Sequence, residues 1–146
     1  MKNTLLAGAA VIAVALGTYT YTRLTDHDLS AGQASTPTQG AAMVAVTLPK
    51  SLSPEASMGK RAFDAVCADC HGANAAGKVG FGPPLIHKIY EPSHHGDMAF
   101  QMAAQNGVRA HHWKFGDMPP QPQVTRADAG SIIAYIREVQ RANGIN

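Results

Sequence analysis

The chain has 146 residues, of which 45% are hydrophobic and 15% are charged, and its net charge is +2. This length and composition fit one small globular domain with a leader in front of it. The near balance of acidic and basic residues excludes nucleic acid as an expected partner, because such partners are bound by strongly basic surfaces.

The first 24 residues are predicted to be a signal peptide or a membrane anchor. No charged residue occurs between Lys2 and Arg23, and the stretch is mostly apolar. A cleaved signal peptide has a short apolar core and small residues before the cleavage site, whereas an anchor needs about 20 apolar residues. Both interpretations stay open, and both place the rest of the chain on the periplasmic side of a bacterial membrane.

Residues 25–50 are predicted to form a flexible linker. Up to residue 42 they are rich in small and polar residues and show no apolar periodicity. The short apolar stretch at 43–48 has no predicted structure. If the preceding segment stays in the membrane, the linker would tether the domain that we expect to span residues 51–146.

The domain at 51–146 is expected to be all-α. Its first helix should begin after Ser53, which is a good N-cap residue, with Pro54 at the first helical position. Gly59 and Phe63 then fall on one apolar face at helical spacing. Glycine on that face permits the close approach of another helix.

Two later helices are also predicted. One should cover residues 93–106, with Ser93 as its N-cap and a stop at the following glycine. The last helix should begin near Thr125, where Asp128 forms a capping-box-like pair with it, and should end at residues 143–144. The stretch at 72–90, rich in glycine and proline, is expected to be a loop.

The run Cys67-Ala68-Asp69-Cys70-His71 has the C-x-x-C-H pattern of c-type haem attachment. Its two thiols can each add to a haem vinyl group, and the adjacent histidine can bind the iron. Further along, Met118 offers a thioether, and the proline that follows it favours extended backbone there. Met98 and Met102 are rival thioethers, but both fall in a predicted helix without a following proline.

The segment from Ser53 to Ile145 resembles the class I cytochromes c. The resemblance is carried by a C-x-x-C-H-G run at 67–72, a Gly-Pro-x-Leu run at 82–85, Met-Pro at 118–119, Gly-x-x-x-Phe at 59–63, and Tyr135 in the last helix. It implies a small helical domain wrapped around one haem c, attached covalently through Cys67 and Cys70. The iron would then be bound by His71 and Met118.

The same resemblance implies roles for neighbouring residues. The Pro83 carbonyl should accept a hydrogen bond from His71, which would fix the imidazole. The first and last helices should cross with Gly59, Phe63 and Tyr135 at the contact. For Trp113, two roles stay open: a hydrogen bond to a haem propionate, or packing on the haem edge.

His/Met ligation would close the iron to substrate and raise its reduction potential. The expected function is therefore one-electron transfer between redox proteins in a periplasmic respiratory or dehydrogenase chain, and not enzymatic catalysis. Two alternatives stay open. The chain could be the permanent cytochrome subunit of a dehydrogenase or oxidase complex. It could instead be a haem enzyme or gas sensor in which Met118 does not bind the iron.

Several other polar residues have no assigned role. The pairs His94-His95 and His111-His112 could hold a metal ion, with copper as the favoured occupant, but solvated or propionate-facing histidines are the favoured interpretation. Three lysines could ring an exposed haem edge and steer acidic partners, or could simply be solvated; they are Lys78, Lys88 and Lys114.

Overall fold

The structure, a computed structural model, describes residues 38–146. The predicted signal or anchor segment, and the linker as far as residue 37, lie outside the described residues. Within 38–146, no helix is both long and apolar enough to cross a membrane.

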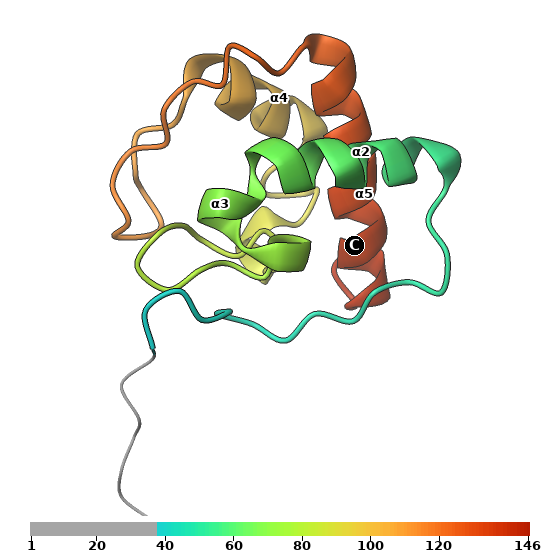
Figure 1. Cartoon of the computed structure of the whole chain (residues 1–146), viewed down its shortest axis with the longest axis horizontal. Helices are drawn as coiled ribbons and strands as arrows, with labels where there is room; N and C mark the ends of the chain where they lie inside the picture. The colour runs from blue at the N-terminus through green and yellow to red at the C-terminus, as the bar shows by residue number, and fades with distance from the viewer. Residues whose placement is uncertain (1–37) are drawn as a thin grey trace, which may run out of the picture. The chain divides into compact units, whose positions relative to one another are not determined.

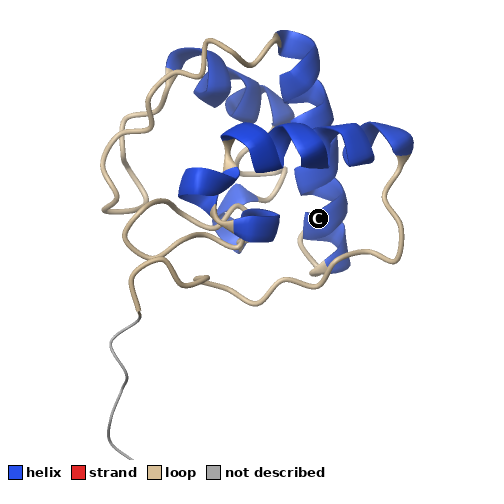
Figure 2. Ribbon diagram, viewed as in Figure 1, coloured by secondary structure: helices blue, strands red, loops and turns tan. Residues whose placement is uncertain are grey.

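The described part of the chain consists of helices joined by long loops (Figure 1). In chain order, the helices and 3-10 turns are α2 (Pro54–Val66), α3 (Ala68–His71), η1 (Ala73–Ala75), η2 (Lys88–Tyr90), α4 (Asp97–Asn106) and α5 (Arg126–Ala142). No strand occurs between residues 38 and 146 (Figure 2), where β-pairing is limited to isolated bridges. The all-α prediction is confirmed.

The predicted ends of the first and last helices are also observed. The Ser53 hydroxyl accepts a hydrogen bond from the Ala56 backbone N–H at 3.1 Å, with Pro54 at the start of α2. Thr125 and Asp128 form a capping box at the start of α5. Each cap satisfies backbone donors that a helix start leaves without partners.

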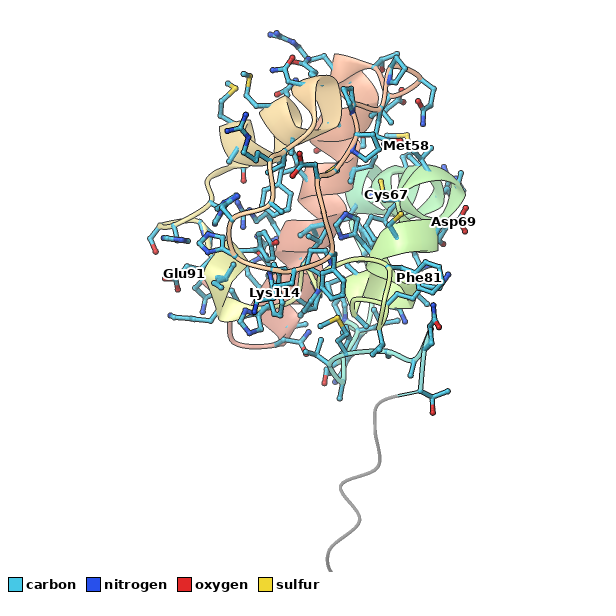
Figure 3. All side chains as sticks on the ribbon, turned by 90° about the vertical axis from the view of Figure 1, so that its left-hand side faces the viewer. Met58, Cys67, Asp69, Phe81, Glu91 and Lys114 are labelled. Carbon is cyan, nitrogen blue, oxygen red and sulfur yellow. The ribbon has the colours of Figure 1, made fainter. Side chains whose placement is uncertain are left out.

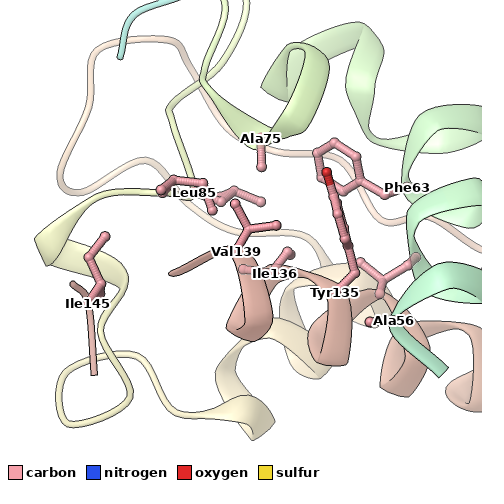
Figure 4. Packing of buried hydrophobic residues seen from close by; sticks show 10 residues of the cluster. Ala56, Phe63, Ala75, Leu85, Tyr135, Ile136, Val139 and Ile145 are labelled. Carbon is pink, nitrogen blue, oxygen red and sulfur yellow. The ribbon is translucent and has the colours of Figure 1, made fainter. Parts of the chain in front are cut away.

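Helices α2 and α5 cross and form the core (Figure 1). Phe63 and Tyr135 are fully buried at this crossing, with ring centroids 5.7 Å apart (Figure 4). Gly59 lies on the buried face of α2, as predicted. The crossing holds the two ends of the domain together and supports the loops between them.

The prediction that a helix begins at Ser93 is wrong, because α4 begins at Asp97. The preceding residues form turns in which the backbone N–H groups of His94 and His95 both donate to the Glu91 carbonyl. The backbone carbonyl of His95 in turn accepts a hydrogen bond from the buried guanidinium of Arg137. Because Arg137 belongs to α5, the residues around Ser93 give no sign of this contact.

Two buried side chains of α5 bind the backbone of residues 85–95. Arg137 donates to the Tyr90 carbonyl at 2.7 Å and pairs with the Asp97 carboxylate at 2.8 Å. Gln140, which is fully buried, donates from Nε2 to the carbonyls of Leu85 and Tyr90 at 2.9 and 3.0 Å. These hydrogen bonds fix an irregular segment that has little regular structure of its own.

The end of the predicted linker lies against the domain. The Gly40 N–H donates to the Val79 carbonyl at 2.9 Å, and the Met43 N–H donates to the Ala76 carbonyl at 3.2 Å. The backbone of Thr47 both donates to and accepts from the Asn143 side chain. Residues 38–48 therefore form part of the domain, which begins earlier than the predicted residue 51.

Candidate functional site

A cavity of about 410 Å³ lies inside the domain. Its wall is mostly apolar and is built by residues from α2, α4, α5 and the two long loops, including Leu85, Phe100, Val108, Ile132 and Ile136. His71 and Met118 both line it, although they lie far apart in the sequence. The fold therefore brings the two predicted iron ligands to one cavity.

His71, at the end of α3, is held by the loop that follows it. Its Nδ1 lies 2.9 Å from the Pro83 carbonyl oxygen, as the resemblance implied. Because a carbonyl can only accept, Nδ1 carries the proton and Nε2 keeps a free lone pair. Burial lowers the pKa of His71, although the hydrogen bond to Pro83 acts in the opposite direction. This imidazole is oriented as a metal ligand.

The backbone of Met118 is fixed by an antiparallel bridge. Its N–H and carbonyl both pair with Val108, each at 2.9 Å. Next to the bridge, Gly107 has φ +74°, and a Cβ there would lie 2.4 Å from the Met118 carbonyl oxygen. Only glycine combines this φ with so close an approach. By contrast, the rival thioethers Met98 and Met102 are 65% and 48% exposed and do not line the cavity.

The two cysteines differ in their surroundings. Cys67 lines the cavity, whereas Cys70 is exposed and does not line it. Burial, followed by the nearby Cys70, raises the pKa of the Cys67 thiol to about 11. Neither cysteine is in a disulfide, so both thiols are free to attach a group that extends from the cavity toward the surface. Figure 3 shows Cys67 on the same half of the molecule as Phe81 and Asp69.

Trp113 also lines the cavity, and its indole N–H is buried without a hydrogen-bond partner. The ring packs edge-on against His87, at 5.3 Å between centroids, and stacks near Phe115 at 6.2 Å. A buried donor without an acceptor costs about 1–3 kcal/mol. A group in the cavity that carries an acceptor, such as a carboxylate, would satisfy it. Trp113 can therefore both pack in the cavity wall and donate a hydrogen bond from its indole N–H.

The histidine pairs, expected to be solvated or to face a haem propionate, lie at the rim of the cavity. His95, His111 and His112 line the cavity, and His94 lies beside them. Desolvation, and then the neighbouring imidazoles, lower the pKa of His112. The paired histidines were the only available signal, and they could not show that the two pairs meet across two loops.

One protein-family model covers most of the domain that contains this cavity. The cytochrome c family model matches residues 56–140, which is more than half of the chain. The chain belongs to the cytochrome c family. The matched range includes the C-x-x-C-H run and Met118. A search of curated proteins returned no match.

Membership of the cytochrome c family implies a haem with its iron, and the cavity fits this group. Its wall is apolar, as a porphyrin requires. His71 offers a free imidazole nitrogen, Met118 offers a thioether, and the unpaired indole N–H of Trp113 offers a donor for a propionate. The thiols of Cys67, in the cavity wall, and of Cys70, outside it, are both free.

Proposed function

We propose that this cytochrome c is a one-electron carrier between separate redox proteins and not an enzyme. The observation that carries the proposal is that His71 and Met118, each held by a backbone contact, line one cavity. A haem bound there by both residues supplies a reversible Fe(III)/Fe(II) couple. With both ligand positions filled by the protein, no site remains for a substrate.

The residues of the chain limit structural change between the two redox states. The Pro83 carbonyl keeps the ring of His71 in one orientation, and the bridge to Val108 keeps the backbone of Met118 in place. The apolar wall excludes water and disfavours extra positive charge, and a soft thioether favours Fe(II). Together these features support a raised reduction potential and fast electron exchange.

We propose that one haem is attached through both cysteines. Because Cys70 is exposed, a haem bonded to it would reach the surface there. Phe81, which is 45% exposed, lies nearby in sequence, with the Lys78 ammonium 4.5 Å from its ring centroid. An exposed aromatic ring beside a cation suits the small, transient interfaces of electron-transfer partners.

The lysines suggested to steer partners differ in how far their charges are paired. Lys78 donates to the Asp69 carbonyl at 3.0 Å, and Lys88 forms an ion pair with Glu91. Only the charge of Lys88 is paired with an opposite charge; the carbonyl that Lys78 contacts is neutral, so Lys78 keeps its charge for steering acidic partners. We propose a periplasmic location, with residues 1–24 acting as signal or anchor, because attachment of haem c and the charge pattern of the leader both point there.

The proposed function is tested by optical spectroscopy of the haem-loaded full chain and of Met118→Ala. The wild-type Fe(III) form should show the weak red band of sulfur-to-iron coordination, and Met118→Ala should lose it. Met98→Ala is the control and should keep it. The reduced wild-type protein should not bind carbon monoxide, and its redox titration should follow a one-electron curve.

The two alternatives give different results. A wild-type protein that lacks the red band and binds carbon monoxide would have an open iron, which supports a haem enzyme or sensor. A permanent subunit of a larger complex would purify from its native membrane or periplasm with its partner in constant ratio. Either result would overturn the proposal of a free carrier.

A further inference from the structure

Four imidazoles from two separate loops meet at the rim of the cavity. His94 and His95 precede α4, and His111 and His112 lie in the loop before Met118. The ring centroids of His94 and His112 are 5.4 Å apart, and those of His95 and His112 are 5.2 Å apart. The haem ligation described above uses none of these side chains.

Three of these residues have metal-site geometry. One ring nitrogen each from His94, His95 and His112 lie within 4.8 Å of one another. A zinc–imidazole bond is about 2.0–2.1 Å long, so two nitrogens on one tetrahedral ion are roughly 3.3–3.4 Å apart. Because His94 and His112 are exposed, small rotations of their side chains close this difference.

The ring of His95 is already oriented by the protein. Its Nδ1 lies 2.7 Å from the Ile89 carbonyl oxygen, so Nδ1 carries the proton and Nε2 keeps its lone pair. Its backbone carbonyl is held by the buried Arg137. A carbonyl behind the ring and a fixed backbone are the features that hold metal-binding histidines in place.

The second loop is also constrained. The bridge between Val108 and Met118 closes it, and the Ala110 N–H donates to the Asp117 carboxylate at 2.8 Å. His111 Nδ1 lies 2.9 Å from the Arg109 carbonyl. These hydrogen bonds constrain the loop, in which His112 lies close to His94 and His95. His111 lies next to the site.

We propose that His94, His95 and His112 bind one divalent late transition-metal ion, with Cu²⁺ preferred to Zn²⁺. Three imidazoles with no carboxylate or thiolate suit these ions, and the usual affinity order places copper above zinc. Three protein ligands leave a further coordination position for water. The site lies at the cavity rim and is distinct from the two iron ligands.

The test is calorimetric titration of the haem-loaded full chain with Cu²⁺ and, separately, with Zn²⁺ in a buffer that does not bind metals. The wild-type protein should bind one ion per chain at this site. His94→Gln and His112→Gln should each weaken binding by about tenfold or more. His87→Gln is the matched control, because His87 lies outside the cluster, and its affinity should equal that of the wild type.

A second measurement does not depend on the variants. Chemical modification of histidines in the wild-type protein, read by mass spectrometry, should show that Zn²⁺ protects His94, His95 and His112 but not His87. The proposal is overturned if neither ion binds with saturation. It is equally overturned if His94→Gln and His112→Gln bind as the wild type does, or if protection is absent at all three histidines. A tighter affinity for Zn²⁺ than for Cu²⁺ would overturn the stated metal preference.

Discussion

Gly59 of α2 lies directly against the backbone carbonyl of Ser131 in α5: a Cβ atom on Gly59 would be 1.8 Å from that oxygen. Gly59→Ala therefore requires the helices to move apart at the centre of the core, at a cost of about 1–3 kcal/mol or more. Chemical unfolding of the haem-loaded protein measures this loss.

Gly130→Ala is the matched control for that prediction. Gly130 lies within α5 with no atom within 4 Å of a built Cβ, so alanine there should stabilise the protein by about 0.5–1 kcal/mol through helix propensity. Equal effects at the two positions would contradict the close-approach argument.

A second prediction concerns the backbone around Met118. Gly107→Ala places a Cβ 2.4 Å from the Met118 carbonyl oxygen, so the thioether should shift. The reduction potential should fall and the red sulfur band should weaken. Gly116→Ala is the control: Gly116 also has a positive φ, of +88°, but its Cβ would meet no atom within 4 Å. If both variants shift the potential alike, backbone strain rather than the contact is responsible.

Arg137→Gln should be strongly destabilising. Arg137 is only 6% exposed, and its guanidinium donates to the Tyr90 and His95 carbonyls. Its removal takes this donor from the His95 carbonyl and from Gln140 Oε1, whereas the Tyr90 carbonyl keeps its hydrogen bond from Gln140 Nε2. The expected cost is about 1–3 kcal/mol. Its ionic partner Asp97 has a side chain that is 68% exposed, so Asp97→Asn should cost about 1 kcal/mol or less. Thermal unfolding should separate the two variants; similar midpoints would place the energy in the ion pair.

Trp113→Phe keeps the aromatic packing but removes the unpaired N–H. If that N–H donates to an anionic propionate, its loss leaves the negative charge less compensated, which favours Fe(III). The reduction potential should therefore fall while the haem absorption spectrum stays unchanged. Potentiometric titration of both proteins checks this, and an unchanged potential would assign Trp113 to packing alone.

Asp128 should contribute an acid-sensitive part of the stability. The Thr125 hydroxyl, and then its backbone N–H, donate to the carboxylate and lower the pKa of Asp128 in the folded state. A lowered folded pKa gives stability that is present above the unfolded value of about 3.9 and is lost as the pH falls through the folded value. Asp128→Asn should lose this pH dependence in unfolding curves measured over the same range.

The sequence predicted those parts of the fold and site that depend on local patterns. Ser53 and Pro54 mark the start of α2, and Thr125 with Asp128 marks the start of α5, because capping chemistry involves residues close together in the chain. The family resemblance pointed in the same way to the contact between His71 and Pro83.

Features that depend on distant residues were not predictable. The start of α4 shifts to Asp97 because the preceding backbone turns at Glu91 and its His95 carbonyl is bound by Arg137, 42 residues away in sequence. Likewise, no local pattern shows that residues 38–48 bind the domain, or that the two histidine pairs meet. These contacts arise from tertiary packing, which leaves no periodic pattern in a single sequence.

The hydrogen bonds from Gln140 to Leu85 and Tyr90 have a consequence for folding cooperativity. The cavity wall at 85–95 takes its order from the side chains of α5, so the wall and the last helix should open as one unit. Amide hydrogens of both should exchange with solvent at the rate of global unfolding. A haem held in this cavity would then leave only when the whole domain unfolds, even before any covalent bond retains it.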